Sequence, residues 1–200
     1  FMTKLILVRH GETDKNINDS LHASNDPETL NDTGIKQINI TADKLSNYSP
    51  SKIYSSKERR ARESAKIIAD TLKIPVEKID GMQERNWGVF TGKPWGEVKK
   101  VLGPMTLDER YNYVPQDGES WKIFETRLTD AINKILGDNS EKTVVVVTHG
   151  GAIRALMPFL LSLPKEESFK YNPDNASITI FDYNGETFTR VVTNDISHLE

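Results

Sequence analysis

The 200-residue sequence contains no cysteine, which excludes disulfide bonds and thiolate metal sites. It also lacks any apolar run near the roughly 20 residues that a membrane-spanning helix needs, and its first residues do not have the layout of a signal peptide. The absence of cysteine fits a reducing compartment. We therefore expect a cytoplasmic protein without membrane association.

An excess of charge of one sign is also missing. The sequence has 26 lysines and arginines against 29 aspartates and glutamates, a formal net charge of −3, and its basic residues are scattered. Nucleic-acid surfaces need clustered basic residues, so we expect no nucleic-acid partner. An anionic ligand must instead be bound by a local group of arginines.

Aromatic residues are few and unevenly spread. They make up 8% of the chain, and all three tryptophans, Trp87, Trp95 and Trp121, fall within residues 86–121. We expect a single domain, 1–200, with a cap-like excursion at about 86–121. Packing of the excursion on its own aromatics and direct contact of these aromatics with a substrate both remain open.

The clearest motif stands at the end of the first apolar run. Residues 4–8 have the length and composition of a buried strand, and Arg9, His10 and Gly11 follow directly. Ligands of open α/β sheets bind beyond the carboxyl ends of strands, which is where Arg9 and His10 would lie. Gly11 allows a tight turn and a close approach to a ligand.

A second motif of the same kind lies late in the chain. The β-branched run 142–148 predicts a buried strand, and His149, Gly150 and Gly151 follow it. A helix expected over 152–163 would begin beside His149, where its backbone N–H groups favour an anion. One histidine at a strand end is usually structural, whereas two in matching settings indicate a shared site.

A third group of basic residues opens a predicted helix. The pattern over 58–73 is helical, and Arg59, Arg60 and Arg62 fall in its first turn, where the helix dipole disfavours cations. This placement indicates a bound anion. Arginine binds phosphoryl oxygens in bidentate geometry and neutral imidazole is a nucleophile toward phosphorus, so these residue types suit phosphoryl transfer. Neither His10 nor His149 has a partner at metal-ligand spacing, so we expect no metal site.

The remaining segments alternate between strand and helix patterns. A polar loop is expected over 14–33, with a helix after it that carries Ile35, Ile38, Ala42 and Leu45 on one face. Further elements are predicted as strands at 52–56 and 76–82, a helix at 121–136, and a hairpin of 176–183 and 186–193 around Asn184-Gly185.

These motifs resemble those of the histidine phosphatase superfamily, the phosphoglycerate mutase-like proteins. The opening family motif is present as Leu7-Val8-Arg9-His10-Gly11-Glu12-Thr13, with Asn16 at the expected distance. The family pattern Ser-Asp-Leu-x-Arg-Ala-x-x-Thr-Ala corresponds to residues 56–65, where Lys57, Glu58 and Ser64 depart from it. The family's helix start is matched by Leu30, Gly34 and Gln37, whereas Asn31 and Ile38 depart from it.

The resemblance implies a fold and a set of roles. The fold is three-layer α/β/α, with a mostly parallel central sheet and an antiparallel edge. His10 would be the phosphorylated nucleophile and Glu84 the general acid. The residues that would bind and stabilise the phosphoryl group are Arg9, Asn16, Arg60, His149 and Gly150.

Three functions remain open under this resemblance. A phosphatase acting on small phosphorylated metabolites without metal or other cofactor is favoured, because residues 86–120 contain a single arginine, Arg110, where mutases carry several. A phosphoglycerate mutase is the first alternative. A non-catalytic phospho-ligand-binding protein is the second, although such a protein would be expected to have lost one of the motif residues. The sequence also leaves room for a homodimer.

Overall fold

The computed structural model describes residues 2–200, which form a central sheet with the strand order β3-β2-β4-β1-β5-β6. The strands are β1 (Thr3–Arg9), β2 (Lys52–Ser55), β3 (Val76–Lys78), β4 (Thr143–Thr148), β5 (Ile178–Tyr183) and β6 (Phe188–Asp195). The first four strands pair in parallel, whereas β5 runs antiparallel to β1 and β6 antiparallel to β5. The predicted mostly parallel sheet with an antiparallel edge is confirmed.

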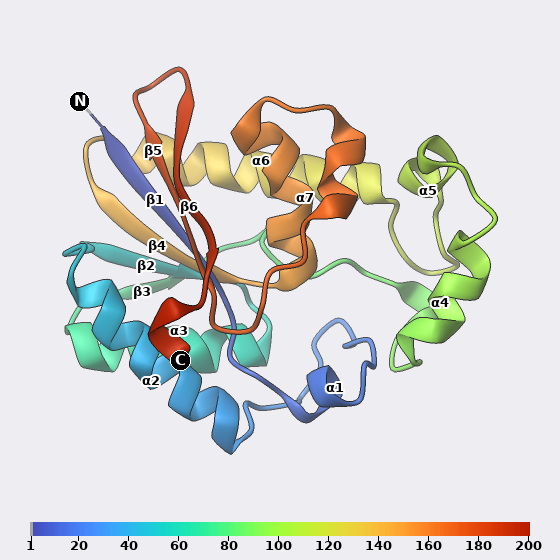
Figure 1. Ribbon diagram of the computed structural model, residues 1–200, viewed down its shortest axis with the longest axis horizontal. Coiled ribbons are helices and arrows are strands. Elements are labelled where there is room, and N and C mark those ends of the chain that lie inside the picture. Colours follow the sequence, from blue (N-terminus) through green and yellow to red (C-terminus); the bar gives the residue numbers. More distant parts are fainter. Residues whose placement is uncertain (1) are drawn as a thin grey trace.

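Helices cover both faces of the sheet (Figure 1). Helices α2 (Asp32–Ser46) and α3 (Arg59–Leu72) lie on one face, and α6 (Trp121–Asp138) and α7 (Gly150–Leu161) on the other. Helices α4 (Trp95–Leu102) and α5 (Leu107–Asn112) project at one end of the molecule, and α1 (Asp14–Ile17) lies near the same end. Short 3-10 turns complete the chain at Gly88–Phe90, Lys165–Lys170 and Ser197–Leu199.

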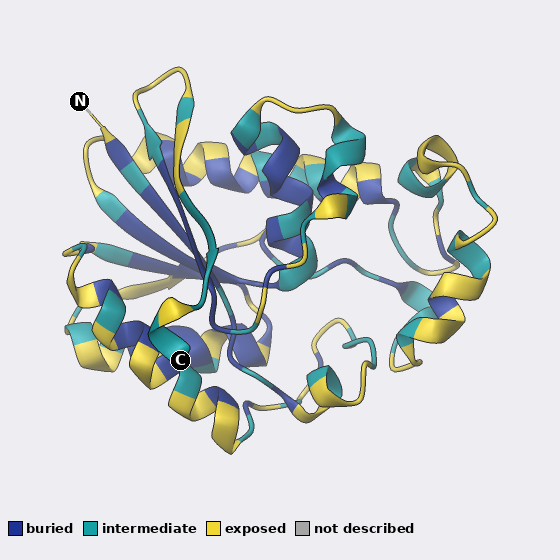
Figure 2. Ribbon diagram, viewed as in Figure 1, coloured by how far each residue is buried: buried dark blue, intermediate teal, exposed yellow. Residues whose placement is uncertain are grey.

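The alternation of side chains along the central strands creates two cores. Leu5 and Leu7 of β1 pack with α6 and α7, whereas Ile6 and Val8 pack with α2 and α3. Because successive strand residues face opposite sides, an unbroken apolar run is required wherever both faces are covered. The central strands are buried along almost their whole length, as Figure 2 shows in dark blue.

Several predicted boundaries differ from the observed ones. The expected loop 14–33 contains α1, because Thr13 caps its first turn in a capping box with Asn16. Ile35 does not belong to the buried face of α2 and is 42% exposed. The strand predicted at 76–82 ends at Lys78, after which residues 79–82 turn toward the site. Helix α7 starts earlier than expected and stops at Leu161, because Ser162 adopts a left-handed conformation.

The C-terminal hairpin is confirmed. Strands β5 and β6 are joined by residues 184–187, which is two residues longer than the predicted turn at Asn184-Gly185, and Gly185 has a positive φ of 99°. The Asn184 side chain accepts hydrogen bonds from the backbone N–H groups of Glu186 and Thr187, which fixes the turn. Among the helices of residues 2–200, none combines the length and the apolar composition that crossing a membrane requires.

Two glycines allow the loop after β1 to pack against α2. A Cβ on Gly11 would lie 2.5 Å from the carbonyl oxygen of Gly34, and a Cβ on Gly34 would lie 2.2 Å from the carbonyl oxygen of Glu12. Backbone atoms cannot yield as a flexible side chain can. Glycine is therefore required at both positions for the segment that carries His10 to reach its place.

We expect Gly34→Ala to lower the free energy of unfolding by about 1–3 kcal/mol, because the added methyl group overlaps the backbone. Urea unfolding measures the change. Gly137→Ala in α6 is the matched control, since a Cβ there meets nothing within 4 Å and alanine favours a helix. Equal denaturation midpoints for the two variants would contradict this account of the packing.

Candidate active site

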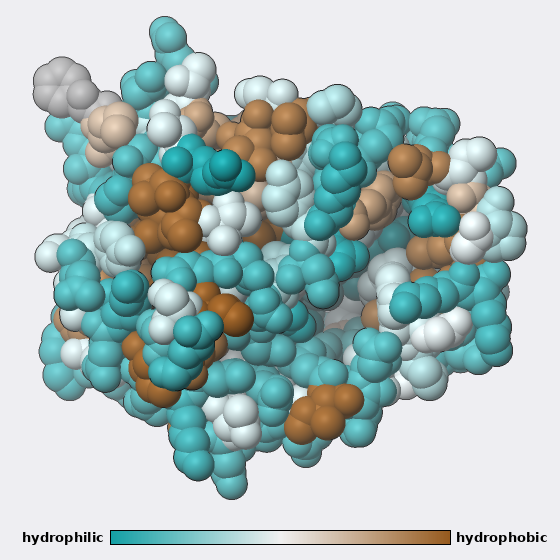
Figure 3. All heavy atoms as spheres, viewed as in Figure 1, coloured by the Kyte–Doolittle hydropathy of each residue, from teal (hydrophilic) through white to brown (hydrophobic). Residues whose placement is uncertain are grey.

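The carboxyl ends of β1 and β4 meet at the base of a cavity. Arg9 is paired with Thr148 across these neighbouring parallel strands, so His10 and His149 follow at adjacent positions. The cavity has a volume of about 370 Å³. Figure 3 shows the surface hollowed between the main body and the α4–α5 end, with a mainly hydrophilic rim.

His10 is buried, with 2% of its surface exposed, and its ring orientation is fixed by the backbone. Its Nδ1 lies 2.7 Å from the carbonyl oxygen of Gly11. A carbonyl oxygen only accepts, so Nδ1 carries the proton and the lone pair is at Nε2. The lone pair of Nε2 is the nucleophilic position of a neutral imidazole.

Arg60 is the arginine of α3 that reaches the site. Its side chain is 1% exposed, and its Nε donates to His10 Nε2 over 3.3 Å. Arg59 and Arg62 are exposed, and Arg59 pairs with Glu63 on the same helix. The helical period explains why Arg60 is buried and the other two arginines are exposed, because residues 59 and 62 face solvent when residue 60 faces the sheet.

His149 lies beside His10, with a distance of 5.3 Å between the ring centroids. Its Nε2 is 2.8 Å from Ser56 Oγ, at the end of β2, and its Nδ1 is buried without a partner. His149 is also the N-cap residue of α7, yet its side chain does not cap the helix. An unpaired buried nitrogen at a helix N-terminus leaves bonding capacity for a ligand.

Arg9 and Asn16 lie on the wall of the same cavity. Arg9 Nη1 donates to the carbonyl oxygen of Pro173 over 2.6 Å, whereas its Nε is buried without a partner. A Cβ on Gly150 would lie 3.1 Å from that Nε, so the small residue leaves room for the guanidinium. Asn16 accepts a hydrogen bond from Asn175 Nδ2, which also donates to the carbonyl oxygen of His10.

Glu84 is held by the backbone at the cavity. Its Oε2 accepts from the N–H of Gly151 over 3.0 Å, and its Oε1 accepts from the N–H of Arg85 over 2.9 Å. A Cβ on Gly151 would come within 2.3 Å of Oε1, so glycine is required for this position of the carboxylate. The turn after β3 therefore brings Glu84 to the first turn of α7.

Burial and neighbouring cations keep the two imidazoles neutral. Desolvation lowers the pKa of His10 and of His149 well below 6.5, and the charges of Arg60 and Arg9 lower both further. Desolvation also lowers the pKa of Arg60, while nearby carboxylates oppose this shift. The site thus combines neutral imidazoles with two buried guanidinium groups, and Arg60 has only the Glu58 carboxylate near it, 3.6 Å away and not hydrogen-bonded. This arrangement is suited to a phosphoryl group.

The aromatic segment contributes to the cavity wall through its three tryptophans, Trp87, Trp95 and Trp121. The Arg85 guanidinium lies 4.0 Å from the Trp87 ring centroid, and it donates to the carbonyl oxygens of Glu119 and Tyr113. The Trp87 and Trp95 rings pack edge to face, with centroids 5.5 Å apart, so packing of the segment on its own aromatics is observed, whereas contact of these rings with a substrate stays a prediction. Arg110 instead donates to backbone oxygens of residues 102–105, outside the cavity.

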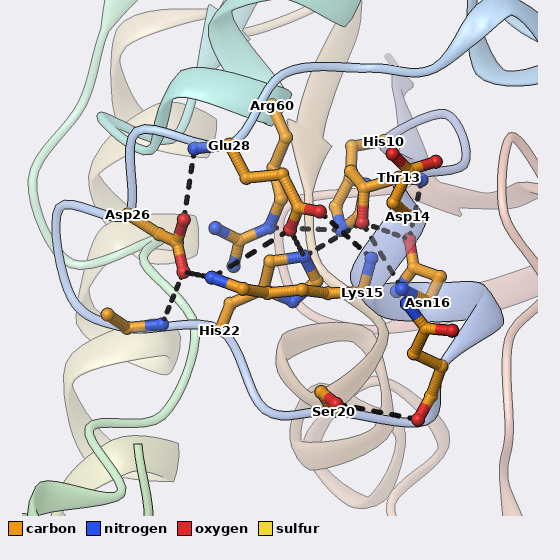
Figure 4. Close-up of polar contacts among 12 residues, drawn as sticks. His10, Thr13, Asp14, Lys15, Asn16, Ser20, His22, Asp26, Glu28 and Arg60 are labelled. Atoms are coloured by element: carbon orange, nitrogen blue, oxygen red, sulfur yellow. Dashed lines mark hydrogen bonds and ion pairs between the residues drawn. The ribbon is translucent and has the colours of Figure 1, made fainter. Parts of the chain in front are cut away.

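Sequence reasoning missed His22 as a site residue. Its ring centroid lies 5.9 Å from that of His10, and its Nε2 lies 2.9 Å from Thr13 Oγ1 and 3.1 Å from Glu28 Oε2. Figure 4 shows how Glu28 and its neighbours hold this ring over the site. Burial lowers the pKa of His22 to about 3. No strand precedes His22, so the strand-end signal that identified His10 and His149 was absent.

The loop that carries His22 is fixed by its own charges. Lys15 forms an ion pair with Asp26, and its backbone N–H donates to Glu28 Oε1 (Figure 4). Asp26 also accepts hydrogen bonds from the backbone N–H groups of residues 23 and 28. The cavity lining includes residues 15–16 and 19–22 of the segment that was expected as a polar loop.

Arg154 and Asn175 were also missed. Arg154 lies one turn after Gly150 on α7 and lines the cavity, where its Nε donates to the carbonyl oxygen of Tyr171. The helical spacing from Gly150 could have identified it. Nothing in the sequence places Asn175 beside His10, because their contact depends on the β1–β5 pairing. The remaining histidine, His198, does not line the cavity, and its Nε2 lies 2.9 Å from Thr41 Oγ1.

Comparisons with known proteins identify the family. Residues 5–196 match the model of the histidine phosphatase superfamily, branch 1. The chain is 34% identical to phosphoglycerate mutase-like protein 4 of Arabidopsis thaliana, over 98% of this chain and 87% of that protein. It is 30% identical to the metal-independent phosphoserine phosphatase of the same plant, over 99% and 84% of the two chains.

A solved structure agrees with these matches. A phosphoserine phosphatase of Entamoeba histolytica, in complex with phosphoserine, superimposes with a TM-score of 0.84 and 28% identity, over 99% of this chain and 100% of that one. The family model covers nearly the whole sequence, including both histidine motifs and the arginine helix. The chain belongs to the histidine phosphatase superfamily.

Proposed function

We propose that this protein hydrolyses phosphate monoesters of small metabolites through a phosphohistidine intermediate on His10. The phosphatase activity rests on the family match and on relatives that are named as phosphatases, among them the metal-independent phosphoserine phosphatase. The single observation that supports the route is the orientation of His10: its Nδ1 carries the proton, so the lone pair is at Nε2, where it accepts a long 3.3 Å hydrogen bond from Arg60, beside the second neutral imidazole of His149.

In the first half-reaction, His10 Nε2 attacks phosphorus in line with the ester oxygen, so that an N–P bond forms as the P–O bond breaks. The Nε–H of Arg60, which donates a hydrogen bond to His10 Nε2, donates instead to a phosphoryl oxygen once the phosphoryl group is bound. Arg9, Arg60 and His149 stabilise the charge on the equatorial oxygens, and Asn16 and the N-terminus of α7 at Gly150 add hydrogen bonds. The Nδ1–H contact with Gly11 stabilises the positive charge that develops on the ring.

Glu84 acts as the general acid in the first half-reaction and as the general base in the second. It gives its proton to the leaving ester oxygen and afterwards takes one from the water that attacks phosphohistidine. The backbone N–H groups of Gly151 and Arg85 orient its carboxylate toward the cavity. Inorganic phosphate is released, and His10 returns to the neutral state.

A mutase is not favoured. Phosphatase names recur among the relatives, and Arg110, the one arginine of residues 86–120, is bound to backbone oxygens outside the cavity. The further cations of the cavity wall, Lys15, Arg85 and Arg154, come from other segments. A purely binding role is not supported either, because the chain keeps His10, Glu84 and the arginines of the motif.

Small phosphorylated molecules are the substrate class. The Arabidopsis relative and the Entamoeba phosphatase are named for phosphoserine, which supports a polar phosphomonoester of similar size here. We propose that residues 86–121 act as a cap over the leaving-group end of a single domain, 1–200. We also propose action without metal ions, a cytoplasmic location, no nucleic-acid partner, and a homodimer as the oligomeric state to test.

We expect His10→Ala to lower phosphate release by at least about 10³-fold, because the nucleophile is lost. The assay measures inorganic phosphate from a panel of sugar phosphates, phosphoserine, phosphoglycerates, nucleotides and an aryl phosphate. His198→Ala is the matched control, since that histidine contacts Thr41 outside the cavity. Normal turnover by the His10 variant, or conversion of 3-phosphoglycerate to 2-phosphoglycerate in place of phosphate release, would contradict the proposal.

The pH profile of kcat/KM is expected to be bell-shaped, because His10 must be unprotonated and Glu84 protonated. Burial lowers the pKa of His10, so it stays neutral as the pH falls through 6.5 and the acid limb begins only below that value. Rates are corrected for titration of the substrate. An acid limb centred at or above pH 6.5 would contradict this assignment, as would an unchanged basic limb in Glu84→Gln.

A further inference from the structure

Glu58 is a buried carboxylate next to the arginine of the phosphoryl site. The pattern of the family has leucine at this position, so this chain replaces an apolar side chain by a charged one. Only 5% of Glu58 is exposed. It occupies the N-cap position of α3, yet its carboxylate does not cap that helix. The carboxylate accepts a hydrogen bond from the backbone N–H of Asn25, but its Oε2 is buried without a partner, and a buried charged oxygen of this kind calls for an explanation.

The carboxylate lies against Arg60 without bonding to it. Glu58 Oε2 is 3.6 Å from Arg60 Nη1, which is beyond hydrogen-bond distance, and both atoms are buried and unpaired. The pKa of Glu58 is raised, chiefly by burial and also by the charges of Glu84 and Asp26, and the Arg60 charge and the backbone N–H of Asn25 oppose this shift only in part. The influence of Glu58 on Arg60 is therefore mainly that of its charge.

A bound phosphoryl group would compete for the same guanidinium. Arg60 donates its Nε–H to His10 Nε2 and faces Glu58 through Nη1. An anion at this site gains the attraction of Arg60 and meets the repulsion of Glu58 in a poorly screened interior. A leucine at position 58 would exert no such repulsion.

We propose that Glu58 is an internal counter-anion of Arg60, which weakens the hold of the site on inorganic phosphate and so speeds product release. It acts through Arg60 and is a positioning residue rather than a catalytic one. Glu84 and Asp26 also carry negative charge toward this region, but the Glu58 carboxylate directly faces Nη1. The proposal rests on the proposed phosphatase function, since it presumes that the site binds phosphate.

The test measures the affinity of the whole protein for inorganic phosphate by calorimetric titration at pH 7.5. Glu58→Gln keeps the volume and removes the charge, and Glu58→Leu restores the residue of the family pattern. We expect both variants to bind phosphate about tenfold more tightly than the unaltered protein. Asp70→Asn is the matched control, because it removes one exposed negative charge from the same helix and leaves the affinity unchanged.

Steady-state kinetics supply a readout that a merely structural role would not produce. Phosphate is expected to inhibit both Glu58 variants at about tenfold lower concentration, with KM lowered in the same direction. Loss of a structural contact would weaken binding and raise KM. Thermal unfolding with and without phosphate shows that each variant is folded, and the stabilisation by phosphate should be larger in the variants.

The outcomes separate this proposal from the function on which it rests. Equal or weaker phosphate binding by a folded Glu58→Gln protein overturns the counter-anion role and leaves the phosphatase intact. Absence of His10-dependent phosphate release by the unaltered protein overturns the phosphatase function, and the counter-anion proposal falls with it. If Asp70→Asn also binds phosphate more tightly, the effect is due to net charge, and the specific role of Glu58 is overturned.

Discussion

The active site depends on one constraint: the guanidinium of Arg60 is buried, and so poorly solvated, beside the neutral imidazoles of His10 and His149. Desolvation disfavours the charged guanidinium and keeps both imidazoles unprotonated, and Glu58, 3.6 Å from Nη1, balances the charge of Arg60 only in part. An incoming phosphoryl group supplies the missing negative charge. The buried Nη1 of Arg60 and Nδ1 of His149, which lack partners, belong to the same site.

The fold maintains this arrangement through backbone constraints. Strands β1 and β4 place the two histidines side by side, and the tight contact between Gly11 and Gly34 holds the loop after β1 against α2. Gly151 leaves the space that the Glu84 carboxylate occupies, because any larger residue would displace this carboxylate. Short-range packing thus fixes the relative positions of groups that come from distant parts of the sequence.

The sequence allowed prediction of the sheet, both of its apolar faces and the strand-end histidines, because buried parallel strands leave a strong apolar pattern. Arg60 could be separated from Arg59 and Arg62 only through the family motif, although the helical period gives the same division once the buried face is known. His22 and Asn175 could not be predicted, since each reaches His10 through loop or cross-strand contacts that no local pattern records.

The central claim is that the phosphoryl group passes through His10, and trapping the phosphoenzyme tests it most directly. Glu84→Gln protein, which hydrolyses the intermediate slowly, is mixed with a ³²P-labelled aryl phosphate, whose leaving group departs without the acid. The reaction is quenched in base within milliseconds, and the label is mapped by peptide mass spectrometry. We predict label on His10 that survives base and is lost in acid. Label on another residue, or substrate turnover without any labelled protein, would contradict the account.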